Sequence, residues 1–211
     1  MSKKRSLDHI PAILLPRKGE PENLFKNKFM EKVSRSPFWV PVLMHSIIII
    51  SFLFLAFSYI TPLTVIALFL FGALFWTFTE YWVHRIVYHC ETKMKWLLRL
   101  QFVAHTIHHQ FPKDAGRLAM PPLPAIILIA AFFGLFWLIG GQYAIAFFPG
   151  FVFGYLLYVS LHYAQHRFKP PKFKPLRELW RFHALHHYQH PDKAFGVSTR
   201  LWDFIFRTTP D

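Results

Sequence analysis

The sequence predicts an all-α integral membrane protein. We expect four transmembrane helices in two hairpins, with a cytosolic helical cap that holds a histidine-rich site. Three observations predict this fold: 54% of the 211 residues are hydrophobic, the basic residues occur in separate blocks, and ten of the 13 histidines fall in four clusters. This apolar fraction excludes a disordered chain, and the length allows one domain. The formal charge of +13 alone would favour a nucleic-acid partner, but its distribution excludes one.

The charge pattern separates basic blocks from apolar stretches. Nine, six and nine Lys and Arg residues lie in three blocks, which are residues 1–35, 85–117 and 167–211. The two stretches between them, 36–84 and 118–166, carry one charged residue, Glu80. Each stretch is long enough for two helices of about 20 residues. We therefore predict a basic cytosolic N-terminal segment, 1–35, followed by a membrane domain, 36–211.

Turn residues divide each apolar stretch in its middle. Thr61-Pro62 interrupts the first stretch, and Gly140-Gly141-Gln142 interrupts the second. The predicted spans are residues 38–60, 62–84, 121–140 and 142–162, and the predicted cap comprises 85–120 and 163–211. Neither hairpin tip carries Lys or Arg, so the positive-inside rule places both termini and the cap in the cytosol. The expected membrane is a bacterial inner membrane or the endoplasmic reticulum, and a soluble all-α fold would not need four such segments.

The clustered histidines border the basic blocks, at one predicted depth on the cytosolic side. The clusters are His84 and His89; His105, His108 and His109; His162 and His166; and His183, His186 and His187. His45 lies inside the first span, and we expect it to be an ordinary core residue.

The spacings within the clusters suit metal binding. Positions i, i+3 and i+4 share a helix face, so the two H-x2-HH motifs are each expected to present three imidazoles. His84 and His89 are five residues apart, about 140° around an α-helix. Their side chains converge only if the helix contains a local wide turn, and this is what we expect. The alternative is that the two histidines bind different metals.

Ten imidazoles exceed the capacity of one ion. They suit two metal ions, or one ion with a rich surrounding shell. Glu80, one turn before His84, is expected to orient a histidine. A metal pair at the membrane face suits oxidation of a lipid, and attack on an unactivated C–H bond requires iron rather than redox-inert zinc. No haem, flavin, iron–sulfur, GxGxxG or P-loop signature occurs, so electrons must come from outside.

Four segments resemble the fatty acid hydroxylase superfamily, and within it most closely the 2-hydroxylases of sphingolipid acyl chains. They are TEYWVHRIVYH (79–89), HTIHHQFPKDAGRLAMPP (105–122), HYAQH (162–166) and HALHHYQHPDKAFGVSTRLWDFIF (183–206). The resemblance implies that all ten clustered histidines bind a dimetal centre, which a cytosolic helical domain closes over a substrate cavity. It implies O2-dependent hydroxylation of an acyl chain at the carbon next to the carbonyl. His190 matches a histidine of relatives, so we expect it to contact the substrate or to support the metal ligands. Tyr158 and Tyr163, on the helix that bears His162, are expected to line the same pocket as the substrate.

The resemblance has one departure. Many eukaryotic relatives carry a fused cytochrome b5 domain, whereas about 35 residues precede the first predicted span here, without an HPGG motif. We therefore expect a separate electron donor, cytochrome b5-like or ferredoxin-like, which docks on the basic surface. The expected cofactors are two metal ions, iron for activity with zinc acceptable in purified protein, and O2 is the co-substrate.

Three alternatives remain open at the level of the sequence. A sterol- or carotenoid-type oxidase would share the histidine spacings. A metal transporter would place its ligands along a path through the membrane rather than at one edge. A structural membrane protein would not need four complete clusters. Of the remaining polar residues, Arg117 is expected to meet a lipid headgroup or Asp114, and Asp203 to act as a cap or an ion-pair partner.

Overall fold

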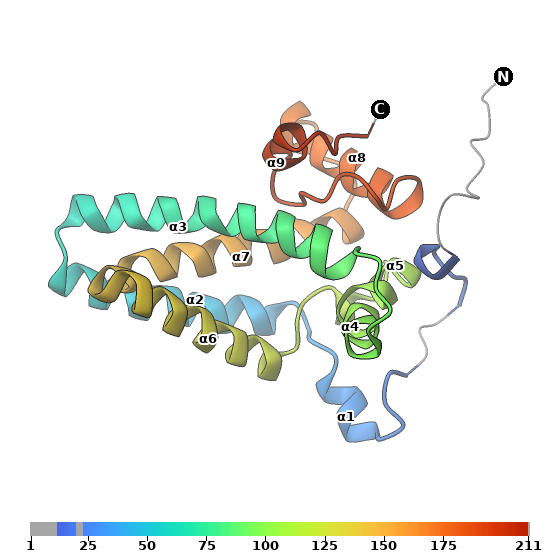
Figure 1. Cartoon of the computed structure of the whole chain (residues 1–211), viewed down its shortest axis with the longest axis horizontal. Coiled ribbons are helices and arrows are strands. Elements are labelled where there is room, and N and C mark those ends of the chain that lie inside the picture. The colour runs from blue at the N-terminus through green and yellow to red at the C-terminus, as the bar shows by residue number, and fades with distance from the viewer. Residues whose placement is uncertain (1–11, 20–22, 211) are drawn as a thin grey trace. The chain divides into compact units, whose positions relative to one another are not determined.

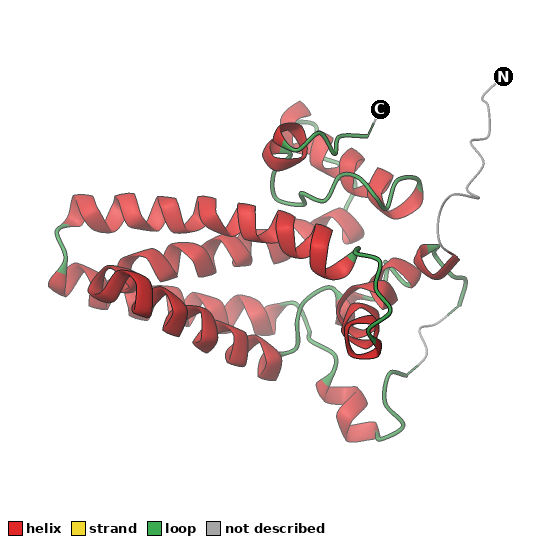
Figure 2. Ribbon diagram, in the orientation of Figure 1, coloured by secondary structure: helices red, strands yellow, loops and turns green. Residues whose placement is uncertain are grey.

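The computed structural model describes residues 12–19 and 23–210, and every regular element in these ranges is helical (Figure 2). The chain forms two compact units. The membrane-helix unit consists of residues 24–80 and 115–164, and the histidine unit consists of residues 81–114 and 165–211 with the residues up to 23. The all-α part of the predicted fold class is confirmed.

Among the described residues, three helical stretches are long and apolar enough to cross a membrane. They are Trp39–Tyr59, Pro62–Tyr88 and a continuous stretch of 53 residues, Ala115–Arg167. The first is helix α2, and the second contains α3 (Pro62–Trp82). The third contains α6 (Pro122–Gly140) and α7 (Ala144–Arg167), joined by a 3-10 turn at Gly141–Tyr143. Helices suit an apolar solvent because they satisfy their backbone polar groups internally.

The long helices lie alongside one another in the membrane-helix unit (Figure 1). Phe52 of α2 packs between Phe133 of α6 and Phe148 of α7, with ring centroids 4.9 Å from each and the rings edge to face. Such aromatic pairs add to the packing that holds membrane helices together.

Small residues bring α7 close to α3. Gly150 and Gly154 are four residues apart on α7. A Cβ atom at Gly150 would overlap the backbone carbonyl of Phe69, and one at Gly154 would overlap the side chain of Trp76. Glycines spaced by four let helix backbones approach closely where apolar burial gives no net attraction between helices.

A buried ion-pair network joins the two non-contiguous parts of the membrane-helix unit. Glu31, in helix α1 (Lys28–Val33), accepts hydrogen bonds from Arg117 at 2.6 Å and Arg35 at 3.0 Å. Its carboxylate also accepts from the backbone N–H groups of Leu24 and Phe25. The Arg117 side chain is 4% exposed and pairs with Glu31, a partner that the sequence analysis did not name.

The histidine unit is built from short helices around the end of α7. They are the π-helix η2 (Val83–Tyr88), α4 (Lys95–Gln101), the π-helix η3 (Phe102–Thr106), α5 (Ile107–Gln110), α8 (Lys174–Tyr188) and α9 (Leu201–Ile205). Tyr81 is fully buried and stacks on Phe206, with ring centroids 5.3 Å apart. This contact joins the residues before η2 to the end of the chain.

We expect Gly150→Ala to lower the free energy of unfolding by about 1–3 kcal/mol, since the added methyl group must push α7 away from Phe69. Unfolding of the purified protein in detergent measures this. Gly134 of α6 has no atom within 4 Å of an added Cβ, so Gly134→Ala is the matched control. It is expected to be neutral or stabilising by about 0.5–1 kcal/mol. Equal destabilisation by both variants would contradict the proposed close approach.

We expect Glu31→Gln to destabilise the protein by about 3 kcal/mol at neutral pH, because it removes the carboxylate charge that pairs with the buried Arg117. Burial opposes ionisation of Glu31, but the hydrogen bonds from Phe25, Arg117 and Arg35 outweigh it and lower its pKa. A lowered pKa gives stability that is present above about pH 4.5 and is lost as the pH falls through the folded-state pKa. The difference between wild type and variant should therefore shrink in acid, and a difference independent of pH would count against this ion pair.

Candidate metal centre

A π-helical turn brings His84 and His89 together. His84 lies within η2, and His89 is the residue that ends it. Hydrogen bonds in a π-helix join residues five apart, so side chains with this spacing lie one above the other. The two ring centroids are 5.0 Å apart. The wide turn predicted from the spacing is confirmed.

Each H-x2-HH motif divides between two groups of histidines. His105 and His109 face one group, whereas His108 faces the other. The structure thus differs from the expected single three-histidine face. Around an α-helix, positions i+3 and i+4 lie on opposite sides of position i, so adjacent histidines diverge by about 100°.

Nine histidines of the histidine unit form the two groups. The first histidine group comprises His84, His89, His105, His109 and His186. The second histidine group, within this unit, comprises His108, His166, His183 and His187. The candidate ligand nitrogens in each group all lie within 4.8 Å of one another. The rings of His109 and His187 stack at 4.2 Å, so the two groups are neighbours.

The shortest contacts in both groups join Nε2 atoms. Nε2 of His105 lies 3.1 Å from that of His84, 2.8 Å from that of His89 and 2.9 Å from that of His109. In the second group, Nε2 of His108 lies 3.1 Å from that of His187, and Nε2 of His183 lies 2.7 Å from that of His166.

Backbone carbonyls decide which nitrogen carries the proton. Nδ1 of His84 donates to the carbonyl of Phe195 at 2.6 Å, and Nδ1 of His186 donates to that of Lys193 at 2.7 Å. A carbonyl only accepts, so the Nε2 atom of each neutral ring keeps a bare lone pair. His105 has at most one proton to share among its three Nε2 neighbours. The first histidine group therefore contains at least two bare lone pairs, on Nε2 of His84 and of His186, an arrangement that a cation stabilises.

Burial keeps the imidazoles neutral. His105 and His187 are 6% and 1% exposed. Burial lowers the pKa of each well below its usual range, and the charges of neighbouring histidines, first of all His109, lower it further. Burial likewise lowers the pKa of His89. Neutral imidazole is the form that binds metals.

The spacing of the nitrogens fits a metal at each group. With metal–nitrogen bonds of about 2.1 Å, ligands at right angles are about 3.0 Å apart. The observed contacts of 2.7–3.2 Å bracket this value. An all-imidazole set suits iron, zinc and copper. These residues fit two metal ions.

A buried carboxylate holds the loop whose carbonyls orient the histidines. Asp203 is fully buried and accepts hydrogen bonds from the backbone N–H groups of Phe195 at 2.9 Å and Gly196 at 2.8 Å. The hydroxyl of Thr208 donates to it at 2.7 Å. A Cβ atom at Gly196 would overlap the carbonyl of Thr199, so this position requires glycine. The expectation of a cap or ion-pair partner for Asp203 missed this role, for which the run FGVSTRLWD was the available signal.

Three of the remaining predicted site residues lie on helix α7. His162 belongs to the membrane-helix unit, one turn before His166 on α7, and its Nδ1 donates to the carbonyl of Leu118 at 3.2 Å. Tyr158 stacks on the His162 ring, and Tyr163 stacks on Phe38.

Two other predicted residues keep their roles as predictions. Glu80 is buried near the end of α3, while the orienting hydrogen bonds of His84 and His186 run to carbonyls. His190 lies in the turn after α8, outside both histidine groups, and its backbone N–H donates to the carbonyl of Leu185 at 2.7 Å.

The membrane-helix unit contains an apolar pocket. All four long helices line it, through His45 of α2, Trp76 of α3, Ile129 of α6, and Phe148 and Tyr155 of α7. His45 is 1% exposed, and its Nδ1 donates to the carbonyl of Pro41, as suits the core residue predicted there.

Known proteins share both sequence and structure with this chain. A profile described as fatty acid hydroxylase matches residues 69–208, which include all ten clustered histidines. Fatty acid 2-hydroxylase of Mus musculus is 34% identical over 90% of this chain and 57% of its own length. Dihydroceramide fatty acyl 2-hydroxylase FAH2 of Arabidopsis thaliana is 32% identical over 90% of this chain and 81% of its own length.

The fold has a close solved counterpart. A structure described as full-length Scs7p, with only the hydroxylase domain visible, superposes with a TM-score of 0.86 and 31% identity, over 94% of this chain and 76% of that one. Against the mouse and rat relatives, this chain spans about half of their length, 57% and 42%.

We expect Asp203→Asn to weaken metal binding by about tenfold or more, the usual effect of losing a group that orients ligands. The amide NH2 group then faces the N–H group of either Phe195 or Gly196 and cannot accept from it, so the carbonyls that hold His84 and His186 shift. Elemental analysis after graded chelation measures the loss. Asp192→Asn, at an exposed position, is the matched control. Equal metal retention in the two variants would contradict the role of Asp203.

Proposed function

The chain belongs to the fatty acid hydroxylase family, and from this membership we propose that it hydroxylates a lipid acyl chain at carbon 2, using O2 and a pair of metal ions. The observation that carries the proposal is the convergence of bare imidazole nitrogens in two adjacent buried groups. Relatives named fatty acid 2-hydroxylase and dihydroceramide fatty acyl 2-hydroxylase support a fatty acyl substrate, either free or in amide linkage. They favour it over the sterol and carotenoid alternatives.

Ten histidines hold the metal pair in this proposal. His162 joins the second histidine group as its fifth member, because it lies one helical turn before His166. Iron, when bound, supplies the redox chemistry with O2 that zinc lacks. The chain's own part is to keep the imidazoles neutral by burial and to aim them through the carbonyls of Phe195 and Lys193.

The proposed substrate site is apolar. The pocket among the four long helices is lined mainly by aromatic and aliphatic side chains, as suits a hydrocarbon chain. We assign Tyr158 and Tyr163 to the approach to this pocket. We assign Glu80 and His190 to the polar surroundings of the metals. Such a site keeps water away from the acyl chain.

The membrane arrangement in this proposal has four spans in two hairpins. The 53-residue stretch is long enough to cross twice, and Gly141, with a φ of +53°, supports a reversal between α6 and α7. The distribution of basic residues supports cytosolic termini and a cytosolic helical cap over the site.

The reaction needs two electrons from a donor. The chain contains no signature for a flavin, a haem or an iron–sulfur cluster. We assign the supply to a redox protein of the cytochrome b5 or ferredoxin type.

Expression with 18O2 in a host that lacks 2-hydroxylated lipids tests the function. We expect lipids one oxygen atom heavier, with the label on carbon 2 of the acyl chain. His108→Ala and His186→Ala should each abolish the product, because each removes a buried ligand from a different group. Asp192→Asn is the control. Lipid mass spectrometry gives the answer, and a hydroxylated sterol, or full activity in either histidine variant, would refute the proposal.

A further inference from the structure

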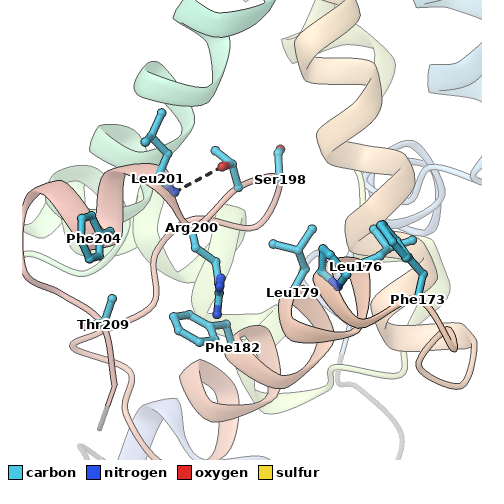
Figure 3. A pocket seen from close by; sticks show the side chains of 11 residues that line it. Phe173, Leu176, Leu179, Phe182, Ser198, Arg200, Leu201, Phe204 and Thr209 are labelled. Carbon is cyan, nitrogen blue, oxygen red and sulfur yellow. Dashed lines mark hydrogen bonds between the residues drawn. The ribbon is translucent and has the colours of Figure 1, made fainter.

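A groove lies between α8 and α9 in the histidine unit. Phe173, Leu176 and Leu179 line one side of it, and Leu201 and Phe204 line the other (Figure 3). Its volume is about 640 Å³.

The groove presents an apolar surface to its surroundings. Phe173 and Phe204 are 68% and 77% exposed, and Leu201 is 43% exposed. Contiguous exposed apolar surface of this kind marks a contact site.

The segment that supplies one side of the groove is basic. Six Lys and Arg residues and a single Glu lie between Arg167 and Arg181. The acidic member, Glu178, is neutralised locally by Arg181 at 3.0 Å and by Arg200 at 3.4 Å. Lys174 and Arg177 are exposed at the start of α8, so the surface complements an acidic partner.

One helix separates the groove from the candidate metal centre. Phe182 lines the groove, with the guanidinium of Arg200 4.6 Å from its ring centroid. The residue after it, His183, and two further histidines of α8 belong to the buried histidine groups. A protein docked in the groove therefore comes within about one helix diameter, 10–12 Å, of these histidines without touching them.

We propose that this groove is the docking site for the electron donor, an acidic protein that carries a one-electron redox centre. The inference rests on the proposed hydroxylase function. Each turnover converts one C–H bond and one O2 molecule into a C–O–H group and one water molecule. It takes up two protons and two electrons, one from each of two reduced donor molecules, which leave oxidised.

Two variants of the full chain in lipid nanodiscs test the docking site. The double variant Lys174→Glu/Arg177→Glu reverses two exposed charges on α8, and Phe204→Ser removes the most exposed ring of the groove. For each variant and for the wild type, the measurement is a ratio of two turnover rates. The rate with a reduced cytochrome b5 haem domain is divided by the rate with dithionite. We expect this ratio to fall about tenfold in the double variant, within the range of electrostatic steering, and its dependence on ionic strength to weaken. Phe204→Ser should lower the ratio at all salt concentrations.

The double variant Lys26→Glu/Lys28→Glu is the matched control, since it reverses two exposed charges in the membrane-helix unit. An equal fall of the ratio in this control would overturn the proposal, as would an unchanged ratio in the groove variants. If turnover of the groove variants falls with both reductants, and only in anionic nanodiscs, the groove binds lipid headgroups instead. If the fall in turnover depends on the density of the protein in the nanodisc, the groove binds a second copy of the chain instead.

Direct binding of the oxidised haem domain, measured by surface plasmon resonance, separates this proposal from the proposed function. If neither reductant supports hydroxylation, the function fails while the binding comparison still tests the groove. Weaker binding to the groove variants than to the control is the expected result.

Discussion

The structure depends on one electrostatic constraint, the crowding of unprotonated imidazole nitrogens in a place that water does not reach. Lone pairs about 3 Å apart repel one another, and burial removes the solvent that would otherwise relieve them. The π-helical turn at His84, the carbonyls of Lys193 and Phe195, and the buried Asp203 all oppose this repulsion. They hold the nitrogens in place, so the free energy of folding and that of binding a cation are linked.

The two units face different requirements. The membrane-helix unit is held by close backbone contact and aromatic packing, as at Gly150 and Phe52, because apolar burial gives little attraction between helices in lipid. The histidine unit is held by specific hydrogen bonds to buried polar groups, as at Asp203. A substitution in the first unit acts mainly on packing, whereas one in the second acts on the direction of a nitrogen.

Much of this arrangement follows from local sequence signals. The runs of apolar residues and their punctuation by Pro62 and Gly141 predicted the long helices, and the five-residue spacing of His84 and His89 predicted the wide turn. The spacing did not predict how the H-x2-HH motifs divide, because that depends on where helices α5 and α8 lie relative to each other. The Arg117 partner of Glu31 also lies far from any local pattern, 86 positions along the chain. Contacts of that range are set by tertiary packing.

The divided motifs have a mechanical consequence. Helices α5 and α8 each contribute to both histidine groups, and the middle histidine of each motif points away from its two companions. Neither helix can rotate or slide to move its histidines in one group without moving its histidines in the other. In the proposed metal pair, the two histidine groups therefore form a single rigid frame, and filling one position stiffens the helices that define its neighbour.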